Sequence, residues 1–200
     1  KLYRWLISEV AEPSDELIGP IAEMLGQQYD VGQVVETMLR SNLFFSQHSQ
    51  RQRIKSPVEY ALGIVQAFGV LVPTLPLGDA VAQLGQDLYA PPTTSGWVGG
   101  RHWVNAATTL ERAKLADSLL AAEGPYGGKL DPQALAQQCG SVTPPDQVDF
   151  FTRLLLQDDL APPARDSLIE GLAAAPGSST DQRLRELTYR IVTFPDFQLC

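Results

Sequence analysis

The sequence predicts an all-α fold, and three observations support this prediction. Helix-start signals, in which a Ser, Thr, Asp or Asn precedes an apolar-periodic run, recur along the chain. The apolar residues follow the period of a helix, and no segment alternates apolar and polar residues over more than a few positions. The segments between these runs are rich in Pro and Gly. We therefore expect about nine mostly short helices in an irregular bundle, with one long Pro/Gly/Trp-rich connection.

The first helices are indicated by residues 14–29 and by the segment that follows. Pro20 lies inside the first pattern, so this helix either begins at Pro20 or kinks there, because proline removes a backbone hydrogen bond. Asp30 is predicted to cap a helix whose apolar face runs from Val31 to Leu39.

The strongest helix signal is SPVE at residues 56–59. Ser56 is the predicted N-cap, Pro57 occupies the first helical position, and Glu59 can reach back to complete a capping box. Further helices are predicted from Leu77, Val81, Leu84 and Leu88, from a second capping-box spacing in TTLE (108–111), from Asp131–Pro132 with Gly140 at the end, from TPPD (143–146), from Pro162–Pro163, and from SSTDQ (178–182).

The weakest point for a division of the chain is GPYGGK at residues 124–129. It separates a predicted N-terminal helical unit, residues 1–123, from a predicted C-terminal helical bundle, residues 129–200, packed on it. One continuous domain is the alternative. The chain begins at Lys1 in what resembles the middle or end of a helix, so we expect a piece of a longer precursor.

The composition excludes several classes of function. The formal net charge is −8, whereas nucleic-acid-binding proteins usually carry excess Lys and Arg, so no nucleic-acid partner is expected. No apolar run approaches the roughly 20 residues that span a bilayer, so no membrane span is expected. Cys139 and Cys200 form no CxxC pair, and both alternatives, free thiols or one disulfide, stay open.

Catalytic and metal-binding signatures are missing. The sequence has no HExxH, GxxxxGK[ST], GxSxG or GxGxxG motif, and its two histidines lie far apart, so we expect no metal and no cofactor. Asp158 beside Asp159, and Asp146 one turn from Asp149, are interpreted as solvated surface charges rather than as acid–base pairs. No catalytic residue is assigned, and a non-catalytic protein is favoured over an enzyme.

Two segments are candidate binding sites. HSQRQRIK (48–55) concentrates the cations Arg51, Arg53 and Lys55 just before the Ser56 cap, which suggests a weak anion site or a solvated connection. PPTTSGWVGGRHW (91–103) combines aromatic, glycine and polar residues, and its candidate binding residues are Trp97, Gly99, Gly100, Arg101, His102 and Trp103. An indole can stack on a flat ligand, Arg101 can grip a carboxylate, and His102 can carry a proton.

The same loop has a structural interpretation. Ordering about ten backbone residues costs on the order of 10–20 kcal/mol. Each buried indole offsets about 4–6 kcal/mol of that cost, because it removes roughly 150–250 Å² from water. Trp97 and Trp103 are therefore expected first to anchor the connection and second to contact a ligand.

Four segments together resemble the C-terminal part of a large bacterial family, domain of unknown function 1800. These are KLYRWLIS (1–8), IKSPVE (54–59), LGQDLYAPPTTSGWVGGRHWVN (84–105) and TFPDFQ (193–198). The GWxGGxxW core is the most specific part of the pattern, and TFPDFQ departs slightly from the usual SPEFQ ending. The match is ordered and covers nearly the whole chain.

The resemblance implies a longer, exported parent protein in the periplasm or cell envelope. It also implies an exported partner protein encoded nearby, from a second family related to sulfatases, and it supplies no catalytic residues. We expect non-catalytic binding of a partner protein or of a carbohydrate or other cell-envelope polymer. One alternative is part of an enzyme acting on polysaccharide or another envelope polymer, with the Trp97–Trp103 loop as a subsite. Another is a scaffold segment that only completes the parent fold.

Overall fold

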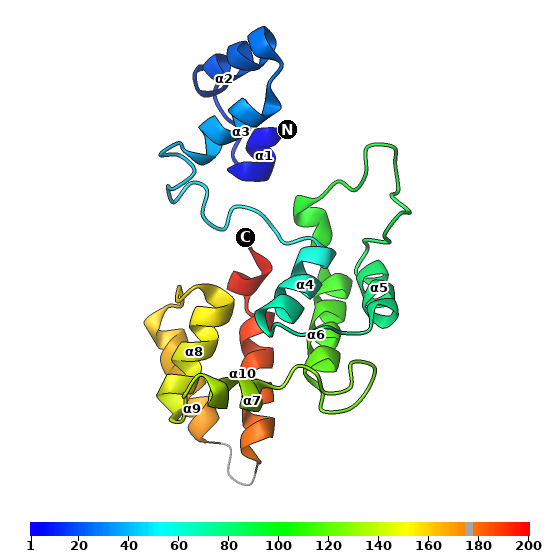
Figure 1. Cartoon of the computed structure of the whole chain (residues 1–200), viewed down its shortest axis with the longest axis vertical. Coiled ribbons are helices and arrows are strands. Elements are labelled where there is room, and N and C mark those ends of the chain that lie inside the picture. The colour runs from blue at the N-terminus through cyan, green and yellow to red at the C-terminus, as the bar shows by residue number, and fades with distance from the viewer. Residues whose placement is uncertain (175–177) are drawn as a thin grey trace. The chain divides into compact units, whose positions relative to one another are not determined.

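The computed structural model describes residues 1–174 and 178–200, and it confirms the predicted all-α fold (Figure 1). The described residues form no strand, and one isolated antiparallel bridge joins Ile54 to Leu199. They form ten α-helices and two 3₁₀ helices: α1 (Leu2–Leu6), α2 (Asp15–Gln28), α3 (Val31–Leu39), α4 (Pro57–Ala67), α5 (Thr74–Gln83), η1 (Gly100–Trp103), α6 (Ala106–Leu120), α7 (Pro132–Gln138), α8 (Pro144–Leu156), α9 (Pro162–Ala173), α10 (Thr180–Thr193) and η2 (Pro195–Gln198).

The chain divides into two compact units, which are described separately. The N-terminal unit comprises residues 1–54 with 199–200, and the C-terminal unit comprises residues 55–198. The main core of the C-terminal unit draws buried residues from both sides of 124–129, and Tyr126 itself belongs to it. The division at 124–129 stays a prediction; the boundary between these two units lies at residues 54–55.

The N-terminal unit has a small apolar core. The hydroxyl of Ser14 accepts a hydrogen bond from the Leu17 amide (3.3 Å), so α2 begins at Asp15 and contains Pro20. The alternative in which this helix begins at Pro20 is therefore wrong. Three buried side chains form the core: Ile7, Val34 and Met38. Half-buried apolar residues of α1, of α2 and of the segment after α3 surround them.

In the C-terminal unit, α10 is the central helix. It packs against α6, α7, α8 and α9 (Figure 1). Its buried face has the predicted helical spacing: Leu184, Leu187, Thr188, Ile191 and Val192. The buried hydroxyl of Thr188 donates to the carbonyl of Leu184 (2.8 Å), so this polar group does not destabilise the core.

Most predicted helix starts are confirmed. Ser56 forms the capping box with Glu59, and the Ser179 hydroxyl accepts from the Gln182 amide at the start of α10. The side chains of Asp30, Asp131 and Thr143 cap α3, α7 and α8 in the same way. These bonds join residues only three positions apart, which explains why the sequence predicts them.

The start of α6 differs from the prediction. The TTLE spacing predicts a start at Thr108, whereas α6 begins at Ala106 with Asn105 as N-cap. The amide oxygen of Asn105 accepts from the backbone N–H groups of Ala107 (2.9 Å) and Thr108 (3.0 Å). In return, the Asn105 backbone N–H donates to the Thr108 hydroxyl (2.9 Å). Thr108 thus completes a capping box from inside the helix.

The end of α5 also differs from the prediction. The helix stops at Gln83, and the predicted face residue Leu88 lies in the exposed connection that follows. Gly85 takes a left-handed conformation (φ +98°), and the Gln86 amide donates back to the Val81 carbonyl (3.2 Å). This glycine termination ends the helix despite the continuing apolar pattern.

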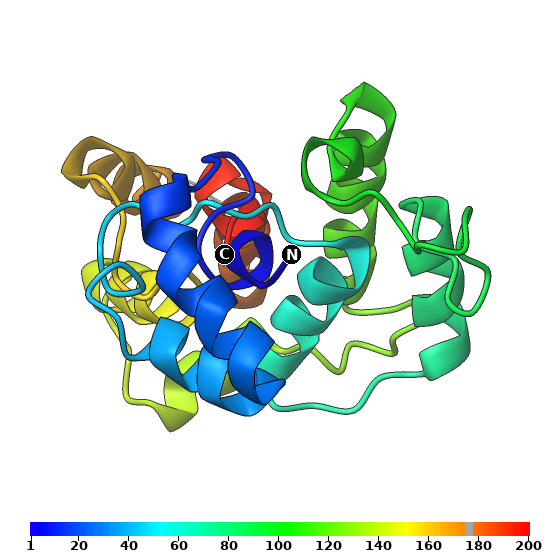
Figure 2. The same cartoon turned by 90° about the horizontal axis from the view of Figure 1, so that it is seen from above.

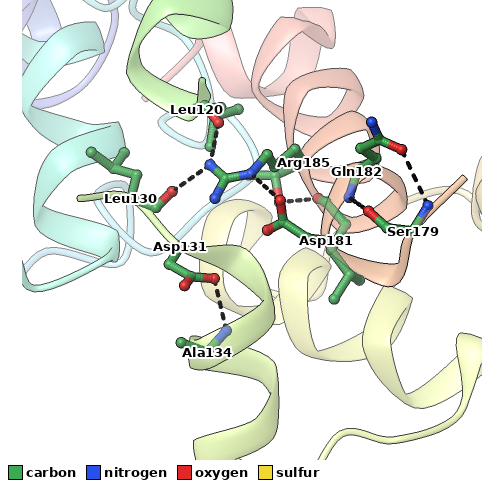
Figure 3. Close-up of polar contacts among 10 residues, drawn as sticks. Leu120, Leu130, Asp131, Ala134, Ser179, Asp181, Gln182 and Arg185 are labelled. Carbon is green, nitrogen blue, oxygen red and sulfur yellow. Dashed lines mark hydrogen bonds and ion pairs between the residues drawn. The ribbon is translucent and has the colours of Figure 1, made fainter. Parts of the chain in front are cut away.

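Arg185 of α10 ties two carbonyl groups from outside its own helix (Figure 3). Its guanidinium donates to the carbonyl of Leu120, at the end of α6, and to the carbonyl of Leu130 (3.1 Å). It also pairs with Asp181 one turn earlier (2.8 Å). Arg185 therefore fixes both ends of the 121–129 connection to the central helix.

Candidate functional site

The long connection from α5 to α6 carries the main candidate residues. It runs outside the helices of its unit as an open loop in both views (Figures 1 and 2). Within it, the Gly96 amide donates to the Thr93 carbonyl (3.0 Å), and the Thr93 hydroxyl donates to the Gly96 carbonyl (3.0 Å). A local turn therefore precedes the first indole.

The glycine pair shapes the next step. Gly99 has φ +79° and ψ −168°, a region that only glycine occupies readily, and Gly100 follows with φ +55°. The chain then enters the 3₁₀ turn η1, closed by a hydrogen bond from the His102 amide to the Gly99 carbonyl (3.2 Å). The conformations of the two glycines thus set the direction of the backbone as it enters η1, and with it the direction of the side chains that follow.

The candidate residues of this loop differ in exposure. Trp103 is buried, with 8% of its surface exposed, whereas Arg101 and His102 are exposed and Trp97 is half-buried. Between the indoles, Val98 is 78% exposed. Trp103 belongs to neither apolar core, so it anchors the end of the connection locally. One indole is thus buried, while the other remains partly open to solvent.

The cations of the basic segment lie in different units. Arg51 and Arg53 belong to the N-terminal unit, and Lys55 begins the C-terminal unit. Within their own units, the Arg53 guanidinium lies 5.1 Å from the ring centroid of Trp5, and the Lys55 amino group lies 3.8 Å from that of Phe197. Both cations therefore engage aromatic rings. The anion site stays a prediction.

A buried network that the sequence did not indicate centres on Arg112 of α6. We call it the Arg112 clasp: the Arg112 guanidinium, the Tyr60 side chain, the Gln198 side chain and the carbonyl of Lys55. Arg112 donates to Gln198 Oε1 (2.8 Å) and to the Lys55 carbonyl (2.7 Å), and its Cζ lies 5.0 Å from the Tyr60 ring centroid. The clasp joins α6 to two of the segments that carry the family resemblance, IKSPVE and TFPDFQ.

Burial sets the protonation states in the clasp. It raises the pKa of the Tyr60 phenol above its ordinary range, with the Arg112 charge as an opposing influence. It lowers the pKa of the Arg112 guanidinium, opposed by Tyr60 and Glu59. The neutral Tyr60 hydroxyl donates to the carbonyls of Arg112 (3.1 Å) and Val192 (3.4 Å). The terminal nitrogens of Arg112 donate to amide and carbonyl oxygens of the protein, while its buried Nε–H has no hydrogen-bond partner among the described residues. The clasp is therefore suited to holding the fold.

The N-terminal unit contains a groove of about 460 Å³. The aromatic residues Trp5, Phe44 and Phe45 line it, together with Arg4 and Arg53. Trp5 and Phe45 are largely exposed. No local sequence pattern indicates this groove, because its residues come from α1, from the end of α3 and the segment after it, and from the C-terminal end.

Residues 1–174 and 178–200 contain no group of three or more His, Cys, Asp or Glu side chains placed to hold a metal ion. Over the same residues, no helix has the length and apolar character needed to cross a bilayer. Cys139 and Cys200 are exposed and form no disulfide with each other.

These features define an all-α protein in which a largely exposed, glycine-rich connection that contains Trp97 and Trp103 joins two helices. The model of the family described as "Protein of unknown function (DUF1800)" matches residues 1–199, so the chain belongs to this family and the predicted family is confirmed. Its place in the C-terminal part of the family stays a prediction. No curated protein and no solved structure matches the chain.

Proposed function

We propose that this chain is a non-catalytic binding region of an exported protein in the periplasm or cell envelope. Its contact surface is the segment from Trp97 to His102, which we call the Trp97 segment. The observation that carries the proposal is a contrast within six residues: Trp103 is buried, whereas Val98, Arg101 and His102 face solvent. The location rests on the family resemblance.

A fixed backbone favours binding by this segment. Association costs free energy for every side chain and loop residue that becomes ordered, and a preorganised loop has already incurred that cost on folding. The η1 turn, the buried Trp103 and the Asn105 cap all act on the residues next to Arg101 and His102. Trp and Arg are also the residue types that most often dominate binding free energy.

The partner is an exported protein or a carbohydrate-containing envelope polymer. A half-buried indole offers an apolar face to either partner, and Arg101 adds a fork of donors for a carboxylate or a sugar hydroxyl. The two kinds of partner are distinguished by what the intact protein retains from its native envelope.

The test is capture of partners by the intact protein, followed by identification of the retained protein or polymer. Trp97→Ala and Arg101→Ala are each expected to weaken capture about tenfold, the usual effect of removing a dominant contact. Tyr89→Ala is the matched control, because Tyr89 is a fully exposed aromatic residue of the same connection outside the Trp97 segment. Unchanged capture by a folded Trp97→Ala protein, or an equal loss with Tyr89→Ala, would contradict the proposal.

The enzyme alternative is tested in the same material. If the segment is a subsite, the intact wild-type protein should release soluble fragments from envelope polysaccharide, and His102→Ala should slow that release. Release by the wild-type protein would replace the non-catalytic proposal. Stable retention without release would favour it.

A further inference from the structure

A pocket of about 330 Å³ lies between α5 and α6, and no residue of the Trp97 segment lines it. The two helices pack against each other (Figure 1), and Pro125 and Tyr126 of the loop that follows α6 complete the lining. We call it the α5–α6 pocket. Its polar side chains are Asp79 and Gln83 from α5, Glu111, Lys114 and Ser118 from α6, and Tyr126 from the loop.

Helical spacing creates the two facing walls. Asp79 and Gln83 are four residues apart on α5, and Glu111, Lys114 and Ser118 follow the same period on α6, so each set occupies one helix face. The third wall depends on Gly128, which has a left-handed φ of +64°. A Cβ added at this position would lie only 2.4 Å from the Ala122 carbonyl oxygen. This close approach folds the loop back on the end of α6.

Tyr126 lines the pocket and contributes a phenol hydroxyl to it. Only 2% of the residue is exposed, and in the part of the chain that the structure describes no group hydrogen-bonds its hydroxyl. Burial, with a contribution from the Asp79 charge, raises the pKa of this phenol, so the hydroxyl stays protonated. Because no described group occupies this hydroxyl, it is available to a ligand as a hydrogen-bond donor or acceptor.

The pocket has one uncompensated negative charge. Lys114 pairs with Glu111 (2.7 Å), which neutralises both. Asp79 forms no ion pair with any described cation. A cation entering the pocket therefore meets an available carboxylate, and the negative charge of the whole chain favours its approach.

We propose that the α5–α6 pocket binds an organic cation, a guanidinium or ammonium group on a short alkyl chain. Asp79 forms the ion pair, while the Tyr126 oxygen and the Gln83 amide oxygen accept hydrogen bonds. A guanidinium fits best, because its planar fork supplies several donors to acceptors on different walls. A sugar fits less well, because the Tyr126 ring is buried and offers no open face for stacking.

The test is an NMR titration of the intact chain with n-propylguanidinium, with n-propylammonium as a second cation and n-propylurea as the neutral comparison. Both cations should shift the amides of Asp79 and Tyr126 saturably, with a dissociation constant on the order of 1 mM for the guanidinium. Propylurea should give no saturable shift. High salt should weaken the binding of both cations.

Three variants locate the site. Asp79→Asn should weaken binding about tenfold, and Tyr126→Phe should weaken it severalfold, because each removes one partner of the cation. Asp117→Asn is the matched control, since it removes an exposed carboxylate of α6 that does not line the pocket. Binding by Asp79→Asn that equals the wild type, equal binding of propylurea, or no saturation with either cation would overturn the proposal.

Discussion

At the scale of single residues, Arg112 is the most consequential side chain that the structure reveals. It is 2% exposed, and none of the described carboxylates forms an ion pair with it. Its charge is stabilised instead by the Gln198 amide oxygen, the Lys55 carbonyl and the Tyr60 ring. A buried charge held by neutral acceptors depends on every one of them, so the clasp is sensitive to small changes.

We therefore predict that Arg112→Ala lowers the free energy of unfolding by about 3 kcal/mol, because it leaves buried acceptors without donors. Arg112→Lys should lose less, since it keeps the charge but cannot reach both acceptors with one fork. Chemical denaturation measures both effects. Lys114→Ala, on the exposed side of the same helix, should change stability by less than about 0.5 kcal/mol. An equal loss in the free energy of unfolding of Lys114→Ala would show that the clasp contributes no more stability than an exposed side chain.

The Asp149–Arg165 pair predicts a small pH dependence. The Arg165 guanidinium donates to both carboxylate oxygens of Asp149 (2.6 and 2.8 Å) and lowers the pKa of that carboxyl. A lowered folded-state pKa stabilises the protein above the ordinary carboxyl pKa, and this contribution is lost as the pH falls through the lower folded-state pKa.

Asp149→Asn should accordingly be slightly less stable than the wild type at pH 7, because both side chains are partly exposed and solvent screens the pair. The difference should begin to shrink below about pH 4, the ordinary carboxyl pKa, and should vanish as the pH falls through the lower folded-state pKa of Asp149. Urea denaturation at neutral and acidic pH measures this difference. A difference that is constant with pH would show that Asp149 acts through packing alone.

At the scale of elements, the 121–129 connection depends on one glycine more than on its neighbour. Gly127 and Gly128 both have left-handed conformations, with φ of +61° and +64°, but only at Gly128 would a Cβ meet the backbone. Gly127→Ala should cost about 1–2 kcal/mol from conformational strain alone. Gly128→Ala should cost about 3 kcal/mol or more, because the loop must also move. Equal thermal stabilities of the two variants would contradict this interpretation.

The same connection is fixed at both ends by Arg185. Arg185→Ala leaves the carbonyls of Leu120 and Leu130 without this donor, so we expect a loss of about 2 kcal/mol in chemical denaturation. Arg190→Ala is the control on the same helix, because Arg190 makes an exposed one-turn pair with Glu186. That change should cost less than about 0.5 kcal/mol. If both variants lose the same stability, the two carbonyl contacts contribute little.

At the scale of the whole molecule, the two units differ in the size of their cores. The core of the N-terminal unit contains three buried residues, whereas the described part of the C-terminal unit contributes a cluster of 26. Local stability follows buried apolar contacts, so the two units should differ in their opening free energies. Amides of α2 and α3 should exchange with solvent at least about tenfold faster than those of α6 and α10. Hydrogen exchange of the intact chain measures this, and equal protection would indicate one cooperative unit.

The sequence determined most of the secondary structure of this protein. Capping hydrogen bonds link residues three positions apart, and apolar faces repeat within one or two turns, so the Ser56 cap and the helix starts at Asp131–Pro132, in TPPD (143–146) and in SSTDQ (178–182) could be predicted without a structure. The predictions for the end of α5 and the start of α6 were wrong because Gly85 and Asn105 set these boundaries, whereas the apolar pattern through Leu88 and the TTLE spacing indicated others.

Only the tertiary structure decided how distant segments meet. The contacts of Arg112 with Lys55 and Gln198 span 57 and 86 positions of the chain, and no local pattern reports such distances. The α5–α6 pocket likewise forms only where one face of α5, one face of α6 and the loop after α6 meet. Exposure, too, is a three-dimensional property: the two indoles of the α5–α6 connection are the same residue type, and packing alone buries Trp103 while leaving Trp97 partly open.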